Sequence, residues 1–247
     1  MAWGQAPSYS AAGIVNASNY TAGPFAPNSV LAVFGTNLAY TTESLSSDTI
    51  AGGKLPTALA SAAVLVDNSP APLLYVSPTQ INFLIPSDQI PGNVTVQVVR
   101  QSVQGPSIAI TLVDAAPAIF PSFTDGSGYI LAEDWNANNA IVTAAAPAHA
   151  GDMVILYATG LGHTAPNPEP GEIPQTAAPI AATDLVVLLN GTALDPSLVK
   201  YAGLTPGCPG LYQVNLLLPQ KNVGTDPEIQ LVMGSQATPA GVKLAVQ

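Results

Sequence analysis

The residues of this chain that could act in catalysis are two histidines on either side of one apolar segment. His149 and His163 are the only histidines among 247 residues, and they flank residues 153–157. A hydrolase needs a nucleophile, a base and an acid that orients the base, and the sequence contains no Gly-x-Ser-x-Gly nucleophile motif. We therefore predict no catalytic residues, and a hydrolase with a cryptic histidine-based site is the least favoured hypothesis.

Metal chemistry has equally little support. The two histidines and the single cysteine, Cys208, provide no zinc-binding spacing. Calcium needs only oxygen ligands from loops, so Asp125, Glu133 and Asp134 are weak candidates because they lie close together beside flexible glycines. The Asp-x-Asp-x-Asp-Gly pattern of calcium loops is absent, and an Asp-Gly pair is also typical of a hairpin turn. We predict neither a bound metal nor a cofactor.

Two aromatic residues in one turn-rich segment are weak candidates for ligand binding. These residues are Tyr129 and Trp135, and a carbohydrate-binding surface would require exposed aromatic rings. Aromatic residues make up only 6% of the chain. The alternative is that the tyrosines pack against a core and keep one polar end in water.

Paired amides occur in two apolar segments. Gln80 and Asn82 are two residues apart, as are Gln213 and Asn215, so each pair shares one face of a strand. An amide carries both donors and acceptors, and we expect each pair to hold the backbone of the loop that precedes it. The same pair in both halves favours this structural role over the alternative, a ligand site.

Short β-branched segments between prolines and glycines predict the elements that position these residues. The chain holds 24 prolines and 21 glycines, and short strands separated by turn residues are typical of a β-sandwich. One helical turn is expected near residues 55–59, because proline suits the first helical position. The expected strands span residues 29–34, 62–66, 80–85, 94–99 and 107–113, and then 153–157, 185–189, 212–218, 228–233 and 242–246.

Three segments recur in the same order in the two halves. Residues 30–38 resemble 153–161, residues 63–68 resemble 186–191, and residues 80–86 resemble 213–219. Such a repeat indicates two copies of one unit. The second copy is longer, because 52 residues separate Leu161 from Gln213 whereas 42 separate Leu38 from Gln80. We expect the extra residues in a surface loop, either 166–179 or 206–210, since loops absorb length at low cost.

These segments also carry a family resemblance. The chain resembles the carboxy-terminal module of large secreted acidobacterial (Solibacter-type) proteins in the strings APLLYVSPTQINFLIP, GDMVILYATGLG and AGLTPGCPGLYQVNLLLP. That module is similar to IPT/TIG immunoglobulin-like domains, and the resemblance covers nearly the whole chain from Ile14 onward. It implies an all-β fold of two tandem immunoglobulin-like β-sandwich domains and a secreted or cell-surface location, but no activity.

The expected organisation is a disordered tail or signal-peptide remnant at 1–13, a first domain at 14–115 and a second domain at 116–247. The chain has 15 acidic and 5 basic residues, a net charge of −10, which argues against nucleic acid and anionic membranes as partners. No apolar run is long enough to insert into a membrane.

We therefore expect a non-enzymatic extracellular structural or adhesion module, with other extracellular proteins or polysaccharide as partners. The alternative is a carbohydrate- or peptide-binding module, with or without the aid of calcium. Charged residues make up only 8% of the chain whereas hydrophobic ones make up 48%, a balance common among extracellular β-proteins and rare among cytosolic enzymes.

Overall fold

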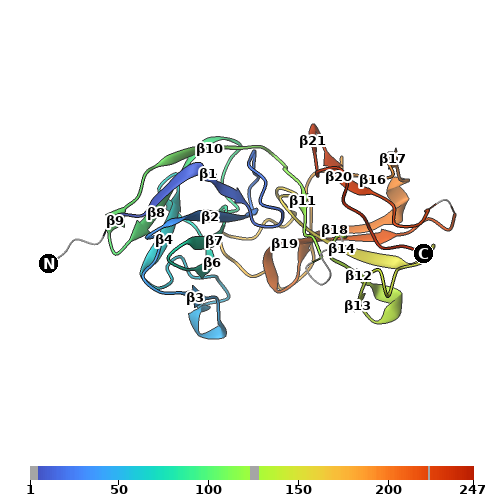
Figure 1. The fold of residues 1–247 in the computed structure, drawn as a ribbon, viewed down its shortest axis with the longest axis horizontal. Coiled ribbons are helices and arrows are strands. Elements are labelled where there is room, and N and C mark those ends of the chain that lie inside the picture. Colours follow the sequence, from blue (N-terminus) through green and yellow to red (C-terminus); the bar gives the residue numbers. More distant parts are fainter. Residues whose placement is uncertain (1–4, 123–127, 222) are drawn as a thin grey trace.

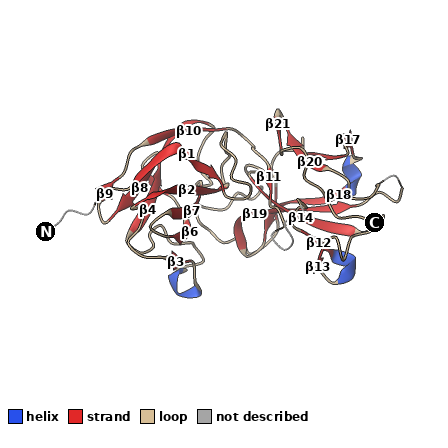
Figure 2. Cartoon of the chain, in the orientation of Figure 1, coloured by secondary structure: helices blue, strands red, loops and turns tan. Residues whose placement is uncertain are grey.

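The chain folds into two β-sandwiches side by side, with its two ends at opposite ends of the molecule (Figures 1 and 2). The structure is a computed structural model that describes residues 5–122, 128–221 and 223–247. Within them the regular elements are strands and short 3-10 helices, η1 (Ser47–Thr49), η2 (Trp135–Ala137) and η3 (Pro196–Leu198). The predicted all-β fold of two tandem immunoglobulin-like domains is confirmed.

The first domain pairs two five-stranded sheets, called here the large and the small sheet by the number of residues in their strands, and every ladder in it is antiparallel. The large sheet runs in the order β1 (Ser8–Asn16), β2 (Val30–Thr36), β7 (Gln80–Leu84), β6 (Leu73–Val76) and β3 (Glu43–Ser44). The small sheet runs β10 (Ile108–Leu112), β8 (Gly92–Arg100), β4 (Ala62–Val66) and β5 (Ser69–Pro70), with β9 (Val103–Gln104) beside β8.

The second domain repeats this plan. Its large sheet runs β13 (Ala140–Ile141), β12 (Ala132–Asp134), β14 (Met153–Thr159), β19 (Cys208–Leu217), β18 (Val199–Thr205) and β15 (Ala178–Pro179), with β11 (Ala118–Ile119) also on β14. The small sheet runs β17 (Thr192–Ala193), β16 (Val186–Leu189), β20 (Ile229–Met233) and β21 (Gln236–Ala237).

Alternation of apolar and polar side chains along these strands builds one core in each domain. In β8 every second residue from Val94 to Val98 is buried, and β19 alternates in the same way. Successive side chains of a strand point to opposite faces, so one apolar set lies between the two sheets. The last buried residue of the first core is Leu112, and the second core begins at Ile119.

Three local expectations were wrong. Strand β1 begins at Ser8, so the segment predicted as a tail up to residue 13 is ordered from there on. The hydroxyl of Tyr9 fixes it by donating to the carbonyl of Pro106 and accepting the Val98 N–H. The turn near residues 55–59 is not helical, because the Pro56 carbonyl accepts the N–H of Leu73 in β6 instead. Residues 242–246 form isolated bridges rather than a strand.

The strand registers of the two domains correspond residue by residue. Residues of β2 and β4 match β14 and β16 with an offset of 123 positions, whereas residues of β7 and β8 match β19 and β20 with an offset of 133. The matched pairs include Val30 and Met153, Val66 and Leu189, Gln80 and Gln213, and Gln97 and Gln230. The ten extra residues of the second domain therefore lie between Leu189 and Gln213.

Most of this insertion lengthens one hairpin. Tyr75 pairs with Asn82 in the first domain, seven positions away, and Tyr201 pairs with Asn215 in the second, fourteen away. Of the two loops that the sequence suggested, the one at 206–210 lies at the tip of this hairpin, which accounts for seven of the ten extra residues, while 166–179 contributes no extra length. The lengthened β18–β19 hairpin brings Gly210 against Leu84 of the first domain.

A set of polar side chains, the interdomain clamp of the buried Asn28 and Thr159 and the exposed Asn167, joins the two sandwiches. Thr159 is fully buried; its Oγ1 accepts the N–H of Val30 at 3.0 Å and donates to the carbonyl of Gly210 at 2.9 Å. Asn167 Oδ1 accepts from Asn28 Nδ2 at 3.3 Å. Because a buried polar group without a partner is costly, these bonds fix how one domain sits on the other.

A second connection, the strap of residues 164–174, runs from the second domain onto the first. The carbonyl of Gly171 accepts the N–H of Leu55 at 2.8 Å, and Ile173 donates its N–H to the carbonyl of Gly53 at 2.9 Å. The side chain of Ile173 packs against a buried cluster that includes Leu55 and Leu84. The proline-rich stretch expected to be a surface loop is therefore part of the domain interface.

Two glycine substitutions test this interface. Gly210 and Gly207 have the same left-handed backbone, with φ of 77° and 80°, so alanine at either position costs about 1–2 kcal/mol in backbone strain. A Cβ at Gly210 would lie 2.3 Å from Leu84 Cδ2, whereas at Gly207 it would meet nothing within 4 Å. Gly210→Ala should therefore lower the free energy of unfolding by a further 1–3 kcal/mol or so, the usual cost of overpacking.

Denaturant titration of both variants measures the difference, and Gly207→Ala is the control for backbone strain. Equal losses of stability in the two variants would contradict the packed interface.

Candidate binding surfaces

Each amide pair predicted from the sequence lies on the outer face of a large sheet and is bonded within itself. Gln80 Nε2 donates to Asn82 Oδ1 at 2.8 Å, and Gln213 Nε2 donates to Asn215 Oδ1 at 3.0 Å. The expectation that the amides hold the preceding loop was wrong. Before β7 that role belongs to Ser77, whose Oγ accepts the N–H of Gln80 at 2.9 Å. Residues two apart on a strand share a face, so the amides satisfy each other first.

Aromatic residues flank both amide pairs on the neighbouring strands. Phe34 pairs with Gln80 and Tyr75 with Asn82 in the first domain. In the second domain the corresponding partners of Gln213 and Asn215 are Tyr157 and Tyr201. Directly opposed residues on adjacent strands are close enough for their side chains to interact. We call each set of two amides and two aromatic residues the amide–aromatic face of its domain. The aromatic residues could not be recognised from a sequence motif, because they lie on other strands and only strand pairing places them beside the amides.

The face of the first domain is open. Phe34 is 38% exposed and Tyr20 is 56% exposed, and their rings meet edge to face with centroids 5.7 Å apart. It is the one ring–ring contact in the described part of the chain. An exposed aromatic pair beside a pair of amides offers both an apolar surface and hydrogen-bonding groups.

The face of the second domain is more closed. Tyr201 donates its hydroxyl to the carbonyl of Leu204 at 2.8 Å and accepts the N–H of Ala178 at 3.1 Å. Burial raises the pKa of Tyr157 to about 12, and the charge and hydrogen bond of Glu133 act in the same direction. Glu133 therefore lies beside Tyr157 of this face.

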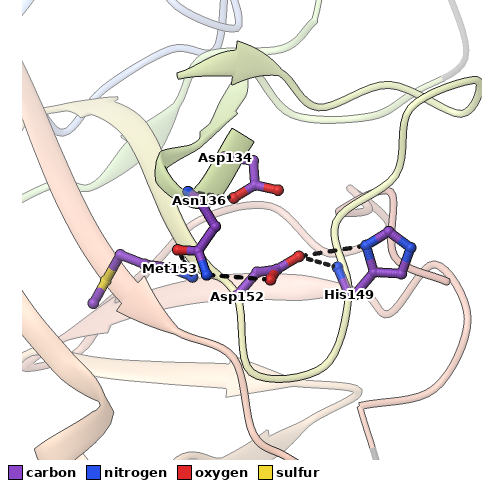
Figure 3. A network of polar contacts seen from close by, with 5 residues as sticks. All are labelled: Asp134, Asn136, His149, Asp152 and Met153. Atoms are coloured by element: carbon purple, nitrogen blue, oxygen red, sulfur yellow. Dashed lines mark hydrogen bonds and ion pairs between the residues drawn. The ribbon is translucent and has the colours of Figure 1, made fainter. Parts of the chain in front are cut away.

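Figure 3 shows the polar network around the other candidate residues. Asp134 Oδ1 accepts the N–H of Asn136 at 2.9 Å and so caps η2. Asn136 contacts Asp152 and the N–H of Met153 at 3.5 and 3.4 Å. Asp152 Oδ2 accepts the N–H of His149 at 2.7 Å and lies 3.4 Å from its Nδ1. These contacts close the loop before β14, a common role of Asp and Asn in turns.

The weak candidates for calcium ligands do not converge in the described residues. Glu133 points to Tyr157 while Asp134 caps η2, and Asp125 lies outside the described residues. No group of three or more His, Cys, Asp or Glu side chains that could hold a metal ion occurs in the described part of the chain.

Tyr129 and Trp135 lie in different environments. The ring of Tyr129 packs against the second core, and its hydroxyl donates to Asp226 Oδ2 at 2.9 Å. Trp135 is 61% exposed on η2. The hydroxyl of Tyr129 is thus held by Asp226. Of the two candidate residues, Trp135 is the one with an exposed ring.

The histidines show no catalytic arrangement within the described residues. His149 is paired with Asp152, and its side chain is 65% exposed. His163 lines a cleft of about 540 Å³ with Asp114 and Asp184, and its Nε2 is buried without a hydrogen-bond partner in the described part of the chain. Cys208 is exposed and unpaired at the tip of the β18–β19 hairpin.

Comparison with known proteins agrees with the fold. The family model of the IPT/TIG domain matches residues 15–113, which form the first sandwich. None of the curated proteins matches the sequence.

Similar solved structures include SGBP-B of the Bacteroides ovatus mixed-linkage glucan utilization locus in complex with a mixed-linkage heptasaccharide. It is 11% identical with a TM-score of 0.33, over 90% of this chain and 43% of that chain, so the chain spans less than half its length. Domains 5–6 of the S-layer protein SbsC are 15% identical with a TM-score of 0.26, over 97% and 98% of the two chains. A titin Ig tandem is 12% identical with a TM-score of 0.25, over 88% and 87%. Likeness at this level carries no information about ligands.

The role of Asp134 can be tested with calcium. Asp134→Ala should lower the free energy of unfolding by about 0.5–2 kcal/mol, because the cap of η2 is lost, and to the same extent with and without calcium. Calcium itself should leave the melting temperature of the native chain unchanged, since a ligand raises it only by binding the folded state.

Asp195→Ala removes the corresponding cap of η3 and is the matched control. A melting temperature that rises with calcium in the native chain and in this control, but not in Asp134→Ala, would establish a calcium site instead.

Proposed function

We propose that this tandem of immunoglobulin-like domains is a non-catalytic structural module of an extracellular assembly, in which the two domains act as one mechanical unit. The observation that carries the proposal is the interdomain clamp, because Thr159 forms hydrogen bonds with both domains through one buried hydroxyl. Domains joined by a flexible linker would not need such bonds.

Further contacts between the domains support a rigid unit. Tyr212 is fully buried in the second domain, where burial raises its pKa while Asn28 of the first domain acts in the opposite direction, and its hydroxyl donates to the carbonyl of Gly162. Ser87 Oγ donates to the carbonyl of Pro168 in the strap at 2.7 Å, and Asn167 Nδ2 donates to the carbonyl of Ser87 at 3.0 Å. Because the two domains lie side by side (Figure 1), load applied across them would be shared between these contacts and the chain that links the domains.

Composition and family resemblance support an extracellular setting. The few charged residues leave a surface of Thr, Ser, Asn and Gln, and the resemblance is to a module of secreted proteins. No helix in the described part of the chain is long and apolar enough to cross a membrane. The partners we propose are other extracellular proteins or polysaccharide rather than nucleic acid, because the acidic chain has few cations to neutralise phosphate.

Calorimetry tests the coupling of the two domains. The native chain should unfold in one transition whose calorimetric and van't Hoff enthalpies agree. Thr159→Val keeps the shape of the side chain but leaves the N–H of Val30 and the carbonyl of Gly210 buried without a partner, each at a cost of about 1–3 kcal/mol. It should lower the melting temperature and divide the transition in two.

Thr111→Val is the control, because the Thr111 hydroxyl bonds Asn93 on an exposed surface of one domain. Two separate transitions in the native chain would contradict the rigid unit.

Carbohydrate binding is a second candidate function, favoured by the open amide–aromatic face of the first domain. It predicts that soluble oligosaccharides bind with or without calcium, and that Phe34→Ala weakens this binding at least tenfold by removing the exposed ring. Isothermal titration after a glycan array measures it. Trp135→Ala, which removes an exposed ring elsewhere, is the control, and loss of binding in that variant alone would place the sugar near η2 instead.

A further inference from the structure

The two sheets of the first domain leave one side of the sandwich open. Between the edge strands β1 and β10 lies a groove of about 490 Å³. It is lined by Ile14, Phe25 and Ile110 together with Ala11 and Ala22, and no charged side chain lines it. An open edge with an apolar floor is a site where another strand can pair.

The corresponding side of the second domain can be located from its hydrogen bonds. In the first domain Phe25 donates its N–H to the carbonyl of Thr111 and accepts the N–H of Val113. In the second domain Ala148 donates its N–H to the carbonyl of Ala245 and accepts the N–H of Gln247. The chain from Lys243 to Gln247 therefore corresponds to the end of β10, and Lys243 corresponds to Ala109.

In the second domain this edge is occupied. Lys243 accepts the N–H of Ile130 at 2.9 Å and donates its own N–H to the carbonyl of Gly128 at 3.3 Å, as in a parallel pairing. The side chain of Ile130 is 1% exposed and belongs to the core. A short extended segment thus closes the second sandwich and inserts one branched apolar side chain between the sheets.

The first domain lacks this segment because its chain is shorter at that place. Ser8 and Tyr9 pair with β2 as Ala118 and Ile119 pair with β14, and Ile14 corresponds to Ala132. In the first domain residues 10–13 connect Tyr9 to Ile14. In the second domain the longer stretch of residues 120–131, which includes the closing segment, connects the corresponding Ile119 and Ala132.

The backbone of Ala109 faces this open edge. Ala109 pairs with Thr95 of β8, but the carbonyl of Thr95 accepts the N–H of Asp67 on its other side. Residues of one strand alternate between the two neighbours to which they hydrogen-bond, so the N–H and carbonyl of Ala109 point away from β8. In the second domain the equivalent groups of Lys243 are the ones that bind the closing segment.

We infer that the groove between β1 and β10 binds an extended peptide segment of a partner protein, paired in parallel with β10 at Ala109. The segment places one branched apolar side chain inward against Ile14 and Ile110, as Ile130 does in the second domain. Main-chain hydrogen bonds provide affinity and the apolar pocket selects the side chain, as in other cases of strand addition. The inference names a class of partner for the module proposed above. It rests on that proposal only for the extracellular location of the partner.

A peptide that copies residues 128–134 is the probe. Labelled at its amino end, it should bind the full chain in a fluorescence anisotropy titration, and the same peptide with Asp in place of Ile130 should bind at least tenfold more weakly. In the complex the amide hydrogen of Ala109 should exchange at least tenfold more slowly by NMR. The amide of Ile110, which pairs with β8, should not change.

Two variants separate backbone pairing from other contacts. Ala109→Pro removes the N–H at a position where an edge strand tolerates proline and should weaken binding at least tenfold, whereas Ala109→Ser keeps the N–H and should bind as the native chain does. Equal binding by Ala109→Pro and Ala109→Ser, or a peptide that leaves the Ala109 amide unprotected, would overturn the inference.

Self-association offers a second readout. If the chain dimerises in sedimentation and Ala109→Pro abolishes this, a second copy occupies the groove in place of a partner protein, and the inference is overturned in its choice of occupant. Absence of peptide binding would also refute it. None of these results depends on the number of calorimetric transitions, so failure of the groove and failure of the rigid unit are distinguishable.

Discussion

The arrangement of the two sandwiches depends on the hydroxyl of Thr159. Its oxygen accepts a hydrogen bond from the first domain and donates one within the second, and no water can replace either partner at a fully buried atom without opening the interface. The carbonyl of Gly210 accepts the hydrogen bond of this hydroxyl. It reaches this position only because the β18–β19 hairpin is longer than the β6–β7 hairpin. Gly210 also packs on Leu84 without a Cβ in between. The interface between the domains therefore depends on the residues inserted in the β18–β19 hairpin.

The repeated strands could be predicted from the sequence because their apolar residues alternate. The segments around Gln80 and Gln213 combine β-branched or aromatic residues with a fixed amide pair, and the structure gives them the same register. Strand β1 could not be predicted in this way. Its first residues, Ser-Tyr-Ser-Ala-Ala-Gly, are mostly exposed, and pairing with β2 together with the Tyr9 hydroxyl holds them instead.

Side-chain partners were harder to predict than strands. Gln80 and Asn82 were expected to bond backbone, yet each lies nearest the other on the same face, a geometry that the period of a strand already implies. The strap at 164–174 has no strand pattern, and its contacts with Leu55 and Gly53 join residues that are far apart in the sequence. Trp135 and Tyr129 were grouped because they are close in sequence, but a hydrogen bond to Asp226 holds one and the short helix η2 exposes the other.

The two domains differ mainly where the second has gained residues, and each gain covers a surface that the first leaves bare. The longer hairpin covers the outer face of β2 and β7 near Val30, while the segment around Ile130 closes the edge beside Lys243. A sandwich has two free sheet edges on each side, and unpaired backbone there is a liability in an isolated domain. The first domain keeps one such edge at Ala109 although its core is otherwise complete. An edge that is closed in one copy of a repeat and open in the other makes the tandem asymmetric, and the strand that we infer would bind at this edge of the first domain and not at the matching edge of the second.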